Sequence, residues 1–302
     1  KSMIWSLYVP LRPSPKKGLE NAIYFEESAW NKIVDHAARN GINQIVMELN
    51  NGLHFASAPE LAMGGAWTRQ KARTEAKRLK ALGIELIPLM NFSATHHQWL
   101  GEYGRMMSTK EYYRVCRELI REVYEVFDRP RYIHIGMDEA HHVGLGKFLD
   151  KNGFKNRYDI LLYHLNRVFD IAKKYGYETL MWNDMFFRLV QNGDYRTDAD
   201  VNFPAEVTEK IPENCKMVYW DYYAEKAEVY GAMIENSRKL SDNIWFAGGA
   251  WCWGGLTPHN KLSIRRNKVA LPVCMEKGVK NVLLTMWGDD GTECSPFSVL
   301  PA

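Results

Sequence analysis

Two adjacent carboxylates, Asp138 and Glu139, end an apolar, β-branched run that begins at Tyr132. Runs of this kind form buried strands, so the segment is expected to be a strand with both acids at its C-terminal tip. Placing two acids at the end of a buried strand costs free energy unless they are paired, solvated or used in chemistry. Asp138 and Glu139 are therefore either the start of a surface loop or a catalytic pair, and the rest of the chain decides between these.

Eight short apolar runs of this type recur along the chain, separated mostly by amphipathic helical stretches. The predicted strands are Met3–Val9, Asn43–Leu49, Ile84–Met90, Tyr132–Met137, Glu178–Trp182, Lys216–Trp220, Ile244–Ala250 and Asn281–Trp287. The clearest predicted helices are Ser28–Asn40, Arg69–Leu82, Lys110–Phe127, Asp159–Tyr175, Ala224–Leu240 and Lys261–Lys277. Eight strands joined by crossover segments predict an α/β fold, the (β/α)8 TIM barrel. The crossover around Val201–Lys210 is the weakest part of this pattern.

Nothing in the sequence divides the barrel into smaller units. The 302 residues are 46% hydrophobic, which is enough for one large core, and no Ser/Gly linker or low-complexity tract interrupts them. We therefore expect a single domain over residues 1–302. Only fifteen residues follow the eighth predicted strand, Gly288 to Ala302, which is too few for a regular final helix.

Composition argues against two classes of partner. The 39 basic and 36 acidic residues are interspersed, and the basic segment Thr68–Lys80 has the spacing of a solvated helix face, so we expect no nucleic acid partner. No apolar run approaches the length of a membrane span, so no membrane association is expected. The five cysteines, an odd number, are expected to remain thiols, which favours the cytoplasm or another reducing compartment. The chain begins with Lys, so the absence of a signal peptide carries little weight.

The predicted strand ends collect acids, Trp and Tyr, and the working residues of a barrel lie at these ends. The residues concerned are Tyr8, Arg12, Glu48, Asn50, Asn51, Asn91, His96, His97, Asp138, Glu139, Trp182, Asn183, Asp184, Trp220, Asp221, Tyr222, Tyr223, Trp251, Trp253, Trp287, Asp289, Asp290 and Glu293. Aromatic faces stack on the apolar C–H face of a pyranose, and carboxylates accept hydrogen bonds from its hydroxyls. The pattern therefore predicts a sugar site at the rim, whereas Trp5 and Trp245 fall inside strands and are expected in the core.

The segment His134-Ile-Gly-Met-Asp-Glu139 resembles the His-x-Gly-Gly-Asp-Glu signature of family 20 glycoside hydrolases, the β-N-acetylhexosaminidases, with Met137 in place of the second glycine. Leu180-Met-Trp-Asn-Asp184 resembles the fifth-strand Trp-x-Asp segment of that family, and Met286-Trp-Gly-Asp289 resembles its eighth-strand Trp-Gly-Glu. The resemblance implies an exo-acting enzyme that removes terminal β-linked GlcNAc or GalNAc from a carbohydrate substrate. It implies no cofactor and no catalytic metal.

The resemblance also implies a retaining mechanism in which the substrate's own 2-acetamido group is the nucleophile. Glu139 would be the general acid and then the general base, with a pKa above that of a free Glu. Asp138 would orient the acetamido group, and Tyr222, in preference to Tyr223, would hydrogen-bond its oxygen.

The implied sugar-binding residues are Trp182, Trp220, Trp251, Trp253, Trp287, Asp289, Arg12, His96 and Tyr223. His96 stands where the family often carries Pro-Gly-His, although the Pro-Gly is missing here. Arg12 is the nearest candidate for the family's strand-one arginine, but its flanking prolines do not match the usual context, which suggests a divergent branch. His134 is expected to be a buried partner of the site rather than a catalyst.

Three alternatives stay open at this stage. One is a metal-dependent hydrolase, with ligands drawn from His96, His97, His134, His141, His142 and Asp184. Another is a non-catalytic sugar-binding barrel, favoured by the departure at strand one and disfavoured by the intact Asp-Glu pair. The third is a two-carboxylate retaining glycosidase, in which Glu139 is the acid and Asp289 or Glu293 the nucleophile.

Overall fold

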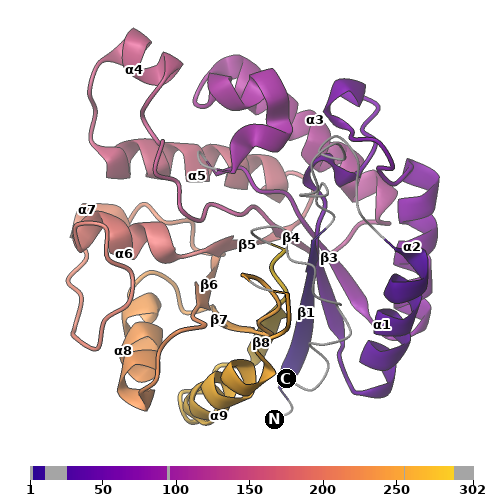
Figure 1. Cartoon of the computed structure of the whole chain (residues 1–302). Helices are drawn as coiled ribbons and strands as arrows, with labels where there is room; N and C mark the ends of the chain where they lie inside the picture. Colours follow the sequence, from indigo (N-terminus) through magenta and orange to yellow (C-terminus); the bar gives the residue numbers. More distant parts are fainter. Residues whose placement is uncertain (1–2, 11–25, 94–95, 255, 289–302) are drawn as a thin grey trace.

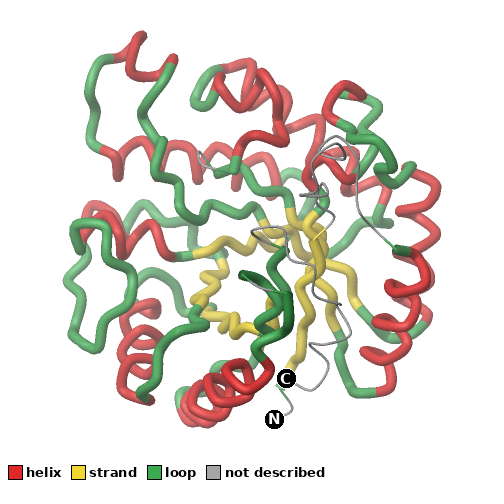
Figure 2. The backbone as a smooth tube through the Cα atoms, viewed as in Figure 1, coloured by secondary structure: helices red, strands yellow, loops and turns green. Residues whose placement is uncertain are grey.

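A computed structural model describes residues 3–10, 26–93, 96–254 and 256–288. Eight parallel strands close into a barrel in the order in which they occur along the chain, and β1 pairs with β8 (Figures 1 and 2). The strands are β1 (Ile4–Pro10), β2 (Gln44–Glu48), β3 (Glu85–Leu89), β4 (Tyr132–His134), β5 (Glu178–Trp182), β6 (Lys216–Trp220), β7 (Ile244–Gly249) and β8 (Asn281–Thr285). Figure 2 shows the ring of strands enclosed by helices, which confirms the predicted (β/α)8 barrel.

All six predicted helices are present within three residues of their predicted bounds. They are α1 (Glu27–Arg39), α2 (Arg69–Ala81), α3 (Lys110–Val126), α5 (Arg157–Lys173), α8 (Ala227–Arg238) and α9 (Asn260–Glu276). The weak crossover between β5 and β6 contains two short helices, α6 (Asp184–Val190) and α7 (Ala205–Thr208), in place of one long amphipathic helix.

Other short elements lie in the loops that follow the strands. These are α4 (Lys147–Asn152) and the 3-10 segments η1 (Asn50–Gly52), η2 (Pro59–Leu61) and η3 (His97–Met106). Figure 1 shows α4 standing away from the barrel, above α5. These insertions follow the C-terminal ends of β2, β3 and β4, the end of the barrel that carries the acids.

Apolar side chains fill the barrel interior and a second layer between the strands and the helices. Trp245 lies inside the barrel and is 2% exposed, whereas Trp5 is partly buried and packs against the outer layer. Trp182 also belongs to the interior cluster and is 1% exposed. Because Trp182 ends β5, it forms the last layer of the core, directly beneath the rim.

Some predictions fall outside the described residues, among them Arg12, Asp289, Glu293 and the absence of a regular final helix. The four described cysteines are unpaired and buried, and Cys294 lies outside the described part. Among the described helices, none combines the length and the apolar character needed to span a membrane.

Candidate active site

Nine of the twelve residues predicted to form the site line one cavity of about 120 Å³ at the C-terminal end of the barrel. The lining residues are His96, Asp138, Glu139, Trp182, Trp220, Tyr222, Tyr223, Trp253 and Trp287. They come from the ends of six different strands, so only the closed barrel brings them together.

Gly136 determines how the chain leaves β4. Its φ of +73° is in the left-handed region, and a Cβ at this position would lie 2.1 Å from Oδ1 and 2.7 Å from Cα of Asn91. Glycine is therefore needed both for the backbone conformation and for the close approach of Asn91. Met137 continues the turn at a φ of +79° and is fully buried. Since methionine has a Cβ, this turn stores strain of order 1–3 kcal/mol, which burial of the Met137 side chain offsets.

Asn91 fixes the position of Asp138. The Asn91 Nδ2 donates to Oδ1 of Asp138 at 2.7 Å, and Oδ1 of Asn91 accepts from the backbone N–H groups of Ser93 and Met137. The backbone N–H of Asn91 donates in turn to Oδ1 of Asn50 at 2.9 Å. This chain of hydrogen bonds ties the ends of β2, β3 and β4 together around one carboxylate.

His96 lies between the two carboxylates. Its Nε2 is 3.3 Å from Oδ2 of Asp138 and 3.7 Å from Oε2 of Glu139, without a well-aligned hydrogen bond to either. Burial opposes protonation of the ring, but the two carboxylates outweigh it and raise the pKa of His96 to about 10. His96 is therefore a cation at neutral pH. Burial tends to raise the pKa of Asp138, yet the contacts with His96 and Asn91 hold that pKa below its usual value, so Asp138 is ionised.

Glu139 contacts a second cation, which the sequence did not indicate. Its Oε1 lies 3.4 Å from Nη2 of Arg188 on α6. His96, together with the charge of Arg188, lowers the pKa of Glu139 against the opposing effects of burial and Asp138. The prediction that the pKa of Glu139 lies above that of a free Glu was therefore wrong. The aromatic wall was visible in the sequence, but the two cations reach Glu139 only through the tertiary fold.

Asp184 holds Arg188 and the turn at Glu139 in place. It is fully buried, and its Oδ2 accepts from Nε of Arg188 at 2.9 Å and from the backbone N–H of Glu139 at 3.0 Å. Oδ1 accepts from the indole N–H of Trp220 at 3.4 Å. Burial and the Asp138 charge raise the pKa of Asp184 to about 6 despite these contacts. Asp184 and Arg188 are four residues apart on one helix, a spacing that is the only sequence signal for this pair.

Aromatic rings form the wall opposite the acids. Tyr222 stacks on Trp220 with centroids 5.5 Å apart and meets Trp253 edge-on at 5.2 Å. Its hydroxyl is buried and has no well-aligned hydrogen-bond partner within the described ranges. Tyr223, by contrast, is 44% exposed. Tyr222 is thus the better placed of the two tyrosines to donate a hydrogen bond to a ligand in the cavity.

The remaining predicted residues lie apart from the cavity or outside the described chain. Trp251 is not a lining residue; it stacks behind Trp253 with centroids 4.4 Å apart and so supports the wall. His134 is fully buried beneath the site, where its ring packs on Trp182, and burial lowers the pKa of His134 to about 3. His134 is therefore neutral, as expected for a buried partner.

No cluster of three or more His, Cys, Asp or Glu with the geometry of a metal site occurs among the described residues. The histidines that suggested a metal site are dispersed: His134 lies below the cavity, His96 pairs with the acids, and His141 lines a different hollow.

The model of the glycosyl hydrolase family 20 catalytic domain matches residues 11–233 of the chain. The chain belongs to glycosyl hydrolase family 20. The match covers the acids at the end of β4 and the aromatic residues of β5 and β6. Comparison with curated proteins finds no match.

Solved structures of hexosaminidases share the fold. A β-N-acetylhexosaminidase from Bacteroides fragilis is 16% identical with a TM-score of 0.65, and the match covers 97% of this chain and 62% of that one. The Streptomyces plicatus N-acetyl-β-hexosaminidase in complex with Thio-NAglucal is 16% identical with a TM-score of 0.64, and the match covers 98% of this chain and 62% of that one. The Vibrio harveyi exo-β-N-acetylglucosaminidase in complex with N-acetylglucosamine is 12% identical with a TM-score of 0.64, and the match covers 100% of this chain and 54% of that one. The chain spans less than two thirds of these structures, and at such identities the likeness establishes the fold alone.

Proposed function

We propose that the chain is the catalytic barrel of an exo-acting β-N-acetylhexosaminidase that removes terminal β-linked GlcNAc or GalNAc. The observation that carries this proposal is the arrangement of Asp138 and Glu139 side by side in a cavity walled by Trp and Tyr. Membership of family 20 supports the same activity.

In the first step the carbonyl oxygen of the 2-acetamido group attacks the anomeric carbon while the glycosidic C–O bond breaks. Glu139 gives its proton to the departing oxygen, and the sugar becomes an oxazolinium ion. In the second step the Glu139 carboxylate takes a proton from water, and the resulting hydroxide oxygen bonds to the anomeric carbon. The ring of the oxazolinium opens, the acetamide is restored, and the β configuration is retained.

Asp138 assists this reaction as an anion. A carboxylate beside the acetamido N–H orients the group for attack and balances the positive charge that develops on it. The low pKa of Asp138 suits this task, because Asn91 and His96 keep the carboxylate ionised and fixed. Tyr222 donates its hydroxyl to the acetamido oxygen, and Trp182, Trp220 and Trp253 enclose the methyl group.

Glu139 must carry a proton before it can act as the acid. Because His96 and Arg188 lower its pKa, the protonated fraction falls as pH rises through the acidic range. We therefore expect an acidic optimum for kcat/KM.

The function is tested with 4-nitrophenyl β-N-acetylglucosaminide and the matching 4-nitrophenyl β-glucoside, using the wild-type chain and Glu139→Gln. We expect the wild-type chain to cleave only the N-acetylated substrate and the variant to lose at least about 10²-fold in kcat/KM. Cleavage of both substrates at similar rates would instead indicate a two-carboxylate glycosidase. Cleavage of neither would indicate a sugar-binding barrel.

A further inference from the structure

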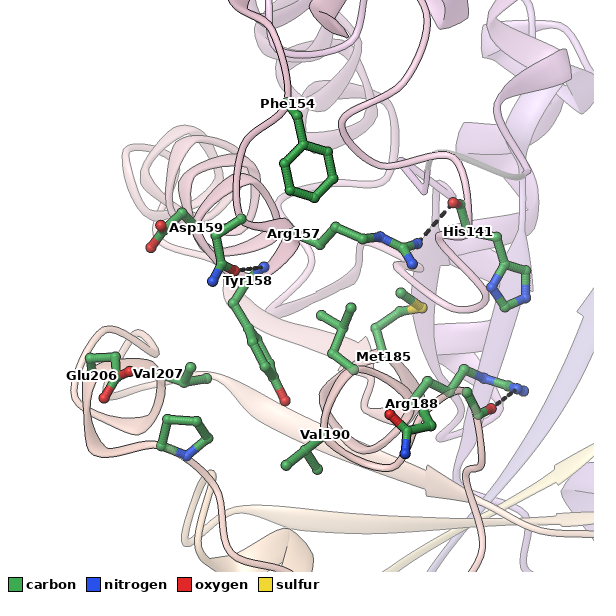
Figure 3. A pocket seen from close by; sticks show the side chains of 15 residues that line it. His141, Phe154, Arg157, Tyr158, Asp159, Met185, Arg188, Val190, Glu206 and Val207 are labelled. Carbon is green, nitrogen blue, oxygen red and sulfur yellow. Dashed lines mark hydrogen bonds between the residues drawn. The ribbon is translucent and has the colours of Figure 1, made fainter.

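A hollow of about 860 Å³, shown in Figure 3, lies beside helix α6 and the N-terminal turn of α5. It is lined by the loop after β4, the N-terminal turn of α5, helix α6 and the start of α7. Arg188 belongs both to this hollow and to the active site, because it lines the hollow and contacts Glu139. Arg188 therefore lies between the hollow and Glu139.

Two arginines lie at one end of the hollow, and of these Arg188 is already paired with Asp184 and Glu139. In Figure 3 the guanidinium groups of Arg157 and Arg188 lie toward His141, whereas Asp159 and Glu206 lie at the opposite end. The Nη2 of Arg157 donates to the backbone oxygen of His141 at 2.8 Å, which holds the guanidinium in place. Burial and Arg188 lower the pKa of His141, so this ring is a neutral hydrogen-bonding group there.

Phe154 gives the hollow an apolar ring. It is 84% exposed, and Figure 3 shows its ring standing over the hollow above Arg157. An exposed ring facing a polar hollow is a suitable platform for the C–H face of a sugar, while Arg157 beneath it supplies a charged hydrogen-bond donor.

The positive charge continues beyond the hollow. A neighbouring depression of about 730 Å³ shares Asn156 and Asp159 with the first and lies over the N-terminal end of α5. Its lining includes four lysines and two acids, the lysines being Lys110, Lys147, Lys151 and Lys155. An extended ligand that leaves the active site past Arg188 would therefore meet further cations.

The reaction fixes which part of a substrate lies here. A general acid must lie beside the oxygen that it protonates, so the leaving group occupies the Glu139 side of the sugar cavity. We propose that the hollow binds the leaving-group part of the substrate and that this part is an acidic oligosaccharide, whose carboxylate or sulfate pairs with Arg157 while its ring stacks on Phe154. This proposal rests on the proposed function of the barrel and adds the class of its substrate.

Binding to the inactive Glu139→Gln variant tests the proposal without requiring turnover. Three probes are titrated calorimetrically: β-N-acetylglucosaminyl-glucuronic acid, the matching disaccharide with glucose, and that disaccharide with a sulfate ester on the glucose. We expect one or both acidic probes to bind about tenfold more tightly than the neutral one, with a preference that shrinks as salt is added. The two acidic probes distinguish a carboxylate ligand from a sulfate ligand.

Three substitutions in the Glu139→Gln background, one of them a control, locate the effect. Arg157→Gln should reduce the preference for acid to about twofold or less, whereas Arg265→Gln should retain it, since Arg265 lies 67% exposed on α9, away from the hollow. Phe154→Ala, at an exposed position that tolerates substitution, should weaken all three probes about tenfold and keep the preference.

Equal affinity for acidic and neutral probes overturns the proposal. It is also overturned if Arg157→Gln leaves the preference for acidic probes intact, or if Phe154→Ala binds all three probes as tightly as the Glu139→Gln chain does. Failure of the proposed function would appear differently, as a wild-type chain that cleaves no N-acetylglucosaminide.

Discussion

Arg188 on α6 lies 3.4 Å from Glu139, the residue that follows Asp138 at the end of β4. The pair places a fixed positive charge beside the proposed general acid. Asp184, four residues before Arg188, anchors the guanidinium through its Nε at 2.9 Å. The proton affinity of Glu139 is therefore set by two neighbours on other elements, His96 and Arg188, as much as by the aromatic cavity.

Replacing Arg188 should move the pH profile of the reaction. Arg188→Gln removes a cation that lowers the pKa of Glu139, so that pKa rises and the proton is retained to higher pH. We expect the alkaline limb of kcat/KM against pH to shift to higher pH, measured with the 4-nitrophenyl N-acetylglucosaminide. Arg265→Gln is the matched control. An alkaline limb that stays in place or moves to lower pH would refute the electrostatic role of Arg188.

The same substitution should weaken the fold, because Asp184 is fully buried and loses its charged partner. Breaking a buried pair costs about 3–5 kcal/mol, which a urea titration near neutral pH would detect. A variant as stable as the wild-type chain would show that Asp184 does not depend on Arg188.

Gly136→Ala should damage both stability and turnover. The added Cβ would lie 2.1 Å from Oδ1 of Asn91, so Asn91 must move and release Asp138. Gly176→Ala is a matched control, since its φ of +79° is similar to the +73° of Gly136 and nothing lies within 4 Å of the new Cβ. The control should lose about 1 kcal/mol of unfolding free energy at unchanged kcat. Gly136→Ala should lose about 3 kcal/mol or more and at least about tenfold in kcat.

Equal losses in the two variants would mean that the backbone conformation alone requires glycine at position 136. The close approach of Asn91 would then have no energetic consequence.

Acid should destabilise the fold through His164. This buried ring donates from Nε2 to the Phe92 backbone oxygen at 2.9 Å and lies 3.0 Å from the Tyr113 hydroxyl, and burial lowers the pKa of His164 to about 4. The unfolded chain binds a proton below about pH 6.5, whereas the folded chain does not. The stability due to this shift is therefore complete above that pH and is lost as pH falls toward about 4.

His164→Gln removes this dependence. The variant should be less stable than the wild-type chain near pH 7, because two buried partners lose their hydrogen bonds. The difference in unfolding free energy should shrink by about 2–3 kcal/mol at about pH 4.5, as measured by urea titrations at both pH values. A difference that is constant or grows in acid would contradict a neutral His164.

Asp138→Asn should affect turnover much more than binding. The amide keeps the size of the side chain but removes the charge that balances the developing cation, so kcat should fall about 10²–10³-fold. The affinity for N-acetylglucosamine, measured by calorimetry, should change less than about tenfold. Unchanged turnover would show that the charge of Asp138 does not take part in the reaction.

The barrel was predictable because its strands are short apolar runs with clear ends. β5 and β6 occupy Glu178–Trp182 and Lys216–Trp220, as predicted residue for residue. β4 is the exception, predicted to continue to Met137 but ending at His134. Gly136 and Met137 have positive φ values, which no strand accommodates, and only the approach of Asn91 explains that turn.

The residues that line the site could be predicted from the strand ends, but the charged contacts that set the pKa of Glu139 could not. Strand ends meet at one rim in any such barrel, so Asp138, Glu139 and the aromatic residues could be grouped from the sequence. Arg188 could not, because it follows β5 inside a crossover whose helices are too short to show a pattern. The pKa of Glu139 depends on this residue and on His96, so its direction was missed.

Participation of the substrate's own acetamido group distinguishes the proposed reaction from double displacement, and a series of 4-nitrophenyl substrates measures it. The acetamido methyl group is replaced by mono-, di- and trifluoromethyl groups, each of which makes the carbonyl oxygen a weaker nucleophile. We expect kcat/KM to fall steeply with each fluorine, for the wild-type chain at its optimal pH. A value of kcat/KM that is the same across the series would rule out acetamido participation, because a protein carboxylate would then be the nucleophile.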